Sequence, residues 1–76
     1  MEISGAQIRA ARALLGWNAA LLAERSGVSP ATVQRTEAGS GSRPVKAVRD
    51  AIVAALEREG VEFIDGGARL KPEAAK

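Results

Sequence analysis

The chain has 76 residues, of which 46% are hydrophobic, 3% aromatic and 26% charged, and it contains no Cys, His or Tyr. This length allows one domain, and the missing Cys and His exclude disulfides and Cys/His metal sites. They also exclude catalytic triads that use His or Cys, so we expect no enzyme and no cofactor. The net charge is only +2. No stretch approaches the ~20 apolar residues of a membrane span, so we expect a cytoplasmic protein without membrane contact.

Four helices are predicted from the residues that start and end them. Ser4 with Gln7 three residues later fits a capping box, and Asn18 is a good N-cap. Ser29 followed by Pro30 combines a hydroxyl cap with proline at the first helical position. Glycine follows each segment as a helix end, and apolar residues recur within the segments at helical spacing. The predicted helices cover about 5–15, 19–25, 30–38 and 44–59.

A short β-hairpin is predicted after the last helix. Residues 61–64 and 68–70 include β-branched and aromatic residues, and they flank the turn sequence Asp65-Gly66-Gly67. An isolated hairpin is marginal in water, so this one must pack on the helices or pair with another chain. We therefore expect a mainly α protein, with a four-helix domain at 1–60, the hairpin at 61–70 and a flexible tail at 71–76.

The most informative segment runs from Asn18 to Glu37. It predicts two short helices joined by a turn of about three residues that contains Gly27. Two helices joined so tightly cross steeply, and the second projects from the domain as a helix must to enter a DNA major groove. The sequence GWNAALLAERSGVSPATVQRTEAG at 16–39 resembles the helix-turn-helix core of the XRE/Cro-repressor family of bacterial and phage regulators. The family pattern of ELA, GVS and xxTIxRxExG reads here as LLA, GVS and TVQRTEAG.

This resemblance covers about residues 6–58 and implies a compact four-helix, repressor-like domain. Such a domain would bind duplex DNA as a small transcriptional regulator, with the helix at about 29–38 in the major groove. Arg12 and Glu37 fall where the family often places a shielded ion pair that fixes this helix. The DNA contacts expected from the motif and from the basic residues beside it are Asn18, Pro30, Ala31, Thr32, Gln34, Arg35, Arg43 and Lys46.

The sequence departs from the family pattern at several positions. The side chains of Pro30 and Ala31 cannot hydrogen-bond a base edge, so base reading would rest on Gln34 and Arg35, helped by Thr32. Gln suits adenine and Arg suits guanine, and each bidentate pair contributes about 1–3 kcal/mol of discrimination. Further departures are Ala19 where Gln is frequent, Leu21 where an acid is usual and Thr36 where an apolar residue is usual.

The charges are unevenly distributed along the chain. From Arg25 to Arg49 there are five basic residues and one acidic residue, which gives a local charge of +4. From Asp50 to Asp65 there are five acidic residues and one basic residue. A basic segment of this kind predicts salt-dependent binding to DNA through the release of counterions.

Two questions stay open at this point. The hairpin either covers the core or forms the contact of a homodimer, and we favour the dimer because two-fold pairing on a palindrome adds affinity. The alternative to DNA binding is a protein-interaction module, such as an antitoxin or adaptor, that captures a partner protein. That partner would contact the hairpin or a surface formed by Leu21, Ala20 and Trp17. We interpret Trp17 as part of the core.

Overall fold

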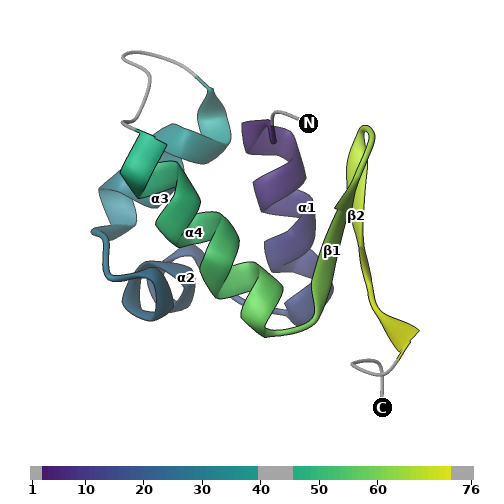
Figure 1. Cartoon of the computed structure of the whole chain (residues 1–76). Coiled ribbons are helices and arrows are strands. Elements are labelled where there is room, and N and C mark those ends of the chain that lie inside the picture. Colours follow the sequence, from purple (N-terminus) through teal and green to yellow (C-terminus); the bar gives the residue numbers. More distant parts are fainter. Residues whose placement is uncertain (1–2, 40–45, 73–76) are drawn as a thin grey trace.

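The computed structural model describes residues 3–39 and 46–72, and in that part of the chain it has four helices and one two-stranded sheet. The helices pack around a common core, and the hairpin lies along α1 on the side away from α2 and α3 (Figure 1). The mainly α fold with a C-terminal hairpin is therefore confirmed. The elements are α1 (Gly5–Leu15), α2 (Ala19–Ser26), α3 (Pro30–Ala38), α4 (Lys46–Arg58), β1 (Val61–Ile64) and β2 (Gly67–Leu70).

The first three helices begin directly after the predicted capping residues. At α1, the Ser4 hydroxyl accepts a hydrogen bond from the backbone N–H of Gln7 (3.1 Å). The side-chain oxygen of Gln7 in turn accepts one from the backbone N–H of Ser4 (2.9 Å). Asn18 and Ser29 cap α2 and α3 through their side-chain oxygens. The predicted start of α4 at Pro44 lies outside the described residues, as does the connector at 40–43.

The core draws on all four helices and on β1. Its largest fully buried side chains are those of Ile8, Leu22, Val33, Ile52, Leu56 and Val61. Between them lie three buried alanines, Ala11, Ala23 and Ala55, whose small side chains let the helices approach closely. A core of this size holds the short helices together through packing, because isolated helices of 8–13 residues are marginal in water.

The hairpin presents an apolar face to α1 and α4 and a polar face to solvent. Val61 pairs with Leu70 and Phe63 with Ala68, and all four contribute to or pack against the core. Glu62 pairs with Arg69 on the opposite face. Gly67 belongs to β2 instead of the predicted turn, because it pairs with Ile64 across the two residues Asp65 and Gly66. The hairpin therefore does cover the core.

Both ends of the hairpin are held by further hydrogen bonds. At the turn, the Gln7 side-chain nitrogen donates to the backbone carbonyls of Ile64 (2.7 Å) and Gly67 (3.1 Å). At the other end, the Lys71 amide donates to the Gly60 carbonyl (2.9 Å), which extends the pairing into the predicted tail. Residues 73–76 of that tail lie outside the described residues. The capping side chain of α1 thus also anchors the hairpin turn.

Candidate nucleic-acid interface

The unit formed by α2, a short turn and α3 is set by local signals. The Asn18 side chain accepts from the Leu21 amide (2.8 Å), and the Ser29 hydroxyl accepts from the Thr32 amide (3.2 Å). Gly27 ends α2 with φ +77°, a left-handed conformation that glycine adopts without strain. The amides of Gly27 and Val28 both donate to the Ala23 carbonyl, which closes the turn before α3 begins.

One face of α3 is buried and the other is exposed. Val33, Thr36 and Glu37 are buried against the rest of the domain. Five of the predicted DNA contacts lie on this helix: Pro30, Ala31, Gln34 and Arg35 are exposed, and Thr32 is half-buried. Positions 31, 34 and 35 share one face because residues three and four apart are neighbours on a helix. The Thr32 hydroxyl lies 2.9 Å from the Ser29 hydroxyl and so takes part in the helix cap.

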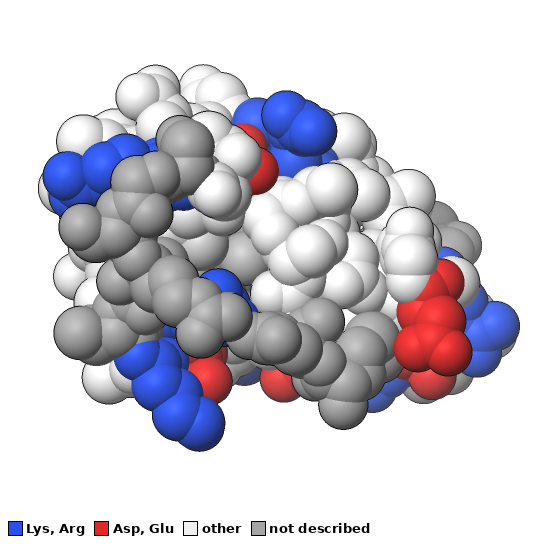
Figure 2. Space-filling model, turned by 90° about the horizontal axis from the view of Figure 1, so that it is seen from above, with Lys and Arg blue, Asp and Glu red and all other residues white. Residues whose placement is uncertain are grey.

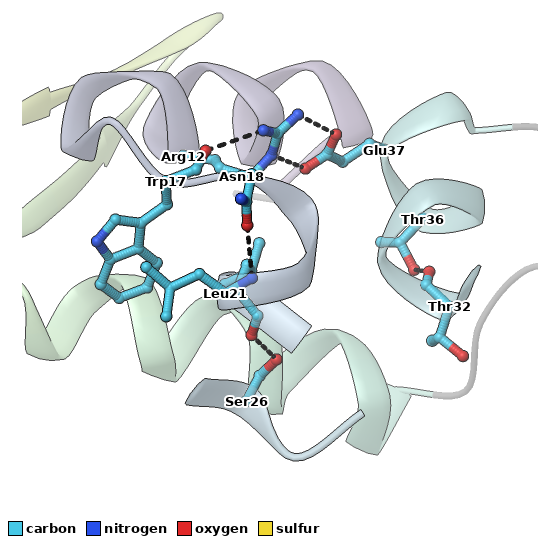
Figure 3. A network of polar contacts seen from close by, with 9 residues as sticks. Arg12, Trp17, Asn18, Leu21, Ser26, Thr32, Thr36 and Glu37 are labelled. Carbon is cyan, nitrogen blue, oxygen red and sulfur yellow. Dashed lines mark hydrogen bonds and ion pairs between the residues drawn. The ribbon is translucent and has the colours of Figure 1, made fainter. Parts of the chain in front are cut away.

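An ion pair joins α3 to α1. The Arg12 Nε and Nη2 groups donate to the two Glu37 carboxylate oxygens at 2.6 Å and 2.9 Å, a bidentate arrangement (Figure 3). The Arg12 Nη1 group also donates to the Trp17 carbonyl (3.0 Å), so the same side chain holds the turn between α1 and α2. Only 8% of the Glu37 side chain is exposed. The hydrogen bonds that Arg12 donates to the Glu37 carboxylate raise the pKa of Arg12, against the opposing effect of burial.

Thr36 is buried, at a position where the pattern that the sequence resembles usually has an apolar residue. Its side chain points back along α3, and its hydroxyl donates to the Thr32 carbonyl (2.8 Å) (Figure 3). The buried hydroxyl therefore has a partner within its own helix, which removes most of the cost of placing it there. This explains how the departure from the pattern is accommodated.

The other predicted contacts belong to segments of the chain outside α3. Asn18 is exposed at the start of α2, where its side-chain oxygen serves as the cap. Lys46 begins α4, is 88% exposed and pairs with Asp50 four residues later (2.9 Å). Arg43 lies outside the described residues. The structure therefore brings together the predicted contacts on α3 and places Asn18 and Lys46 at the starts of two other helices.

The local positive charge is less concentrated than the sequence indicates. Arg25 lies with its guanidinium 5.4 Å from the centre of the Trp17 ring and 3.9 Å from the Glu59 carboxylate, near the end of α4. Arg25 thus belongs to the α2–α4 contact and not to α3. Seen from above, acidic side chains form their largest group at the hairpin end, beside basic ones (Figure 2). Basic side chains also lie at the opposite end, over the α3–α4 side.

Of the apolar surface predicted around Leu21, Ala20 is exposed and the two larger side chains are half-buried. Leu21 and Trp17 are half-buried, and Trp17 packs against the core as predicted. The large hydrophobic side chains classed as exposed within 3–39 and 46–72 are instead Leu14 (43%) and Ile64 (40%). Leu21 therefore offers little area for a partner protein.

These features define a helix-turn-helix domain, with a capped second helix whose outer face is available for contact. The chain matches the family model for a helix-turn-helix domain over residues 5–63, and it belongs to that family. The family is a DNA-binding one with a general role in regulation, and it is typically non-enzymatic. No curated protein matches the chain.

Residues 3–39 and 46–72 contain neither a membrane-spanning helix nor a cluster of metal-binding side chains. None of the helices resolved in the structure is long and apolar enough to cross a membrane. Within the same ranges, no three or more His, Cys, Asp or Glu side chains gather in a way that could hold a metal ion.

Proposed function

We propose that this protein binds duplex DNA with sequence specificity and acts as a small transcriptional regulator of the XRE/Cro-repressor type, with α3 in the major groove. The proposal rests mainly on one observation: one face of α3 is buried against the domain and the opposite face is exposed. Its inner face is fixed by Val33 and by the Arg12–Glu37 pair, whereas Gln34 and Arg35 are exposed on the outer face. A helix held this rigidly can place side chains against base edges with a defined register.

In this proposal, Gln34 and Arg35 carry the direct reading of bases. Gln34 matches the donor and acceptor of adenine, and Arg35 matches the two acceptors of guanine. The methyl groups of Ala31 and Thr32 are suited to contact with thymine, and Pro30 packs against the groove without hydrogen bonds. Because the Thr32 hydroxyl already lies beside that of Ser29, its remaining hydrogen-bonding capacity can serve either a base or a phosphate.

Phosphate contacts would fix the register of α3. Asn18 uses its side-chain oxygen for the helix cap, and its side-chain amide nitrogen can donate to a phosphate. Lys46 is so exposed that its pair with Asp50 contributes little, and a phosphate can replace that partner. Arg43 is assigned to the backbone beyond α3 on its position in the sequence. As a bacterial or phage-type regulator that binds DNA, the protein would act in the cytoplasm.

We further propose that two copies bind together. A single recognition helix contacts about 3–4 bases, and two-fold pairing on a palindrome multiplies both affinity and specificity. The exposed Ile64 and the outer face of the hairpin provide a surface for this contact. DNA binding is favoured over a protein-interaction module, because the family match covers the helix-turn-helix unit and Leu21 is half-buried.

The proposal is tested with the double variant Gln34→Ala/Arg35→Ala. We expect it to fold as the parent does and to lose sequence preference, since each lost bidentate contact removes about 1–3 kcal/mol of discrimination. Gel shifts on a preferred and a scrambled duplex measure this, with circular dichroism as the check of folding. Arg9→Ala is the matched control, because Arg9 is an exposed arginine on α1. An unfolded double variant, or one that keeps its preference, would contradict the assignment.

The contribution of electrostatic attraction to DNA affinity is tested separately, by varying the salt concentration. Binding of the parent protein to a random duplex is expected to weaken steeply between about 50 mM and 200 mM salt, because bound phosphates release counterions. Absence of binding at the lower salt concentration would argue against a DNA-binding role altogether.

A further inference from the structure

The start of α1 lies against the end of α3 at Gly5. A methyl group added at Gly5 would lie 2.3 Å from the Thr36 carbonyl oxygen and 2.4 Å from that of Glu37. Real side chains do not approach other atoms this closely, and both atoms belong to the backbone, so no side-chain rotation can make room. Figure 1 shows the same junction, with the N-terminal end of α1 beside the C-terminal end of α3.

The contact joins helix ends of opposite polarity. The first amides of a helix and the last carbonyls of a helix have no partner within their own helix, and they carry opposite partial charges. At Gly5 the positive end of α1 faces carbonyls in the last turn of α3. The approach is therefore electrostatically favourable, and the missing side chain is what allows it.

The first turn of α1 is also fixed independently of α3. The Ser4–Gln7 capping box closes it, and the Gln7 side chain ties it to the hairpin carbonyls of Ile64 and Gly67. The Arg12 side chain that bonds to Glu37 lies further along α1 and takes no part in the capping box. Any group added at Gly5 would thus displace the end of α3 more readily than the start of α1.

We propose that Gly5 is a positioning residue for the recognition helix. Because Gly5 has no side chain, the fixed first turn of α1 contacts the last turn of α3 directly. This contact sets the position of the end of α3, and the Arg12–Glu37 pair holds the two helices together. Gln34 and Arg35 directly precede Thr36, so their placement in the groove depends on this contact. The inference rests on the proposed DNA-binding function and names a residue outside the DNA interface that determines specificity.

The test compares Gly5→Ala with Gly67→Ala in the full chain. Both changes add one methyl group to a glycine, but at Gly67 the nearest atom is the Ile64 Cγ1 at 3.9 Å, an ordinary contact. The measured quantity is the ratio of dissociation constants for a scrambled and a preferred duplex of equal length, by fluorescence anisotropy. This ratio is independent of stability, since a smaller folded fraction weakens both apparent affinities by the same factor.

We expect Gly5→Ala to lower this ratio by about tenfold or more, the effect of misplacing one bidentate base contact. Gly67→Ala should leave the ratio unchanged when each duplex has the length of a single half-site, because the proposed hairpin contact between two copies then does not contribute. Amide chemical shifts of ¹⁵N-labelled protein should change at Gln34–Glu37 in the Gly5 variant and stay as in the parent in the Gly67 variant. An unchanged ratio in Gly5→Ala would overturn the proposal. So would a Gly5→Ala chain that does not fold at all, because Gly5 would then serve folding and not position.

The same data separate this inference from the proposed function. If the parent protein itself does not discriminate between the duplexes, the proposed function fails. The amide shifts then decide the role of Gly5: displaced α3 signals support it, and unchanged α3 signals contradict it.

Discussion

α3 and the hairpin lie on opposite sides of α1 (Figure 1), and within the described residues a polar side chain of α1 bonds to each of them. Arg12 holds α3 through the carboxylate of Glu37, and Gln7 holds the hairpin through the carbonyls of Ile64 and Gly67. The first link joins two charges, both largely withdrawn from solvent. The second is neutral and joins a side chain to the backbone.

The difference predicts unequal consequences of losing each link. A charge left without its partner inside a protein is costly, whereas a lost neutral hydrogen bond to a carbonyl near a turn can be replaced by water. α3 is thus held to α1 by the stronger of the two interactions, in agreement with its proposed role as the recognition helix. The hairpin is fastened mainly by packing, to which Gln7 adds.

The largest effect is expected from Glu37→Gln, which leaves the Arg12 guanidinium without its carboxylate. We expect a loss of about 3 kcal/mol in the free energy of unfolding, at the lower end for a buried pair because 21% of the Arg12 side chain is exposed. Urea unfolding followed by circular dichroism measures this value.

Glu24→Gln is the control for that experiment, since Glu24 is an exposed carboxylate on α2. Its effect should stay within about 0.5 kcal/mol, as for surface substitutions in general. Equal effects of the two variants would show that the ion pair does not fix α3.

A smaller effect is expected from Gln7→Ala, which removes one half of the capping box and both hydrogen bonds to the hairpin. We expect a loss of about 2 kcal/mol, of which the variant Ser4→Ala, lacking only the cap, should reproduce about 1 kcal/mol. Hydrogen exchange should speed up at β1 and β2 in Gln7→Ala, while α3 keeps its protection. Equal stabilities of the two variants would mean that Gln7 does not anchor the hairpin.

The smallest effect is expected at the hairpin's own ion pair. The Arg69 Nε group donates to a Glu62 carboxylate oxygen at 2.9 Å, whereas Arg12 binds Glu37 through two nitrogens, and both side chains of the hairpin pair are well exposed. A double-mutant cycle with Glu62→Gln and Arg69→Gln should therefore give a coupling energy below about 1 kcal/mol. A coupling energy as large as the loss in Glu37→Gln would show that burial does not distinguish the two pairs.

Much of the fold follows from local sequence signals. Ser4, Asn18 and Ser29 each precede a helix that begins at the next residue, because a side-chain oxygen that satisfies the first amides fixes the start. The two faces of α3 likewise follow from helical spacing, with Val33 and Glu37 inside and Gln34 and Arg35 outside. Contact between these two outer residues and DNA cannot be derived from local sequence signals, and it stays a prediction.

The contacts that position the elements could not be read from local patterns. Gln7 fits a capping box in the sequence, but its bonds to Ile64 and Gly67 span 57 and 60 residues. Gly5 is an ordinary first helical residue until the fold brings the end of α3 against it. The sequence position of Arg25 indicates a basic DNA-facing segment, whereas packing places it beside Trp17 and Glu59.

Selection of bound duplexes from random DNA tests the central claim most directly. With the parent protein we expect enrichment of one sequence, palindromic with half-sites about 34 Å apart if two copies bind together. With Gln34→Ala/Arg35→Ala in the same selection, the enrichment should disappear while binding at low salt remains. Enrichment of no sequence by the parent protein, or of the same sequence by both proteins, would contradict the assignment of α3 as the recognition helix.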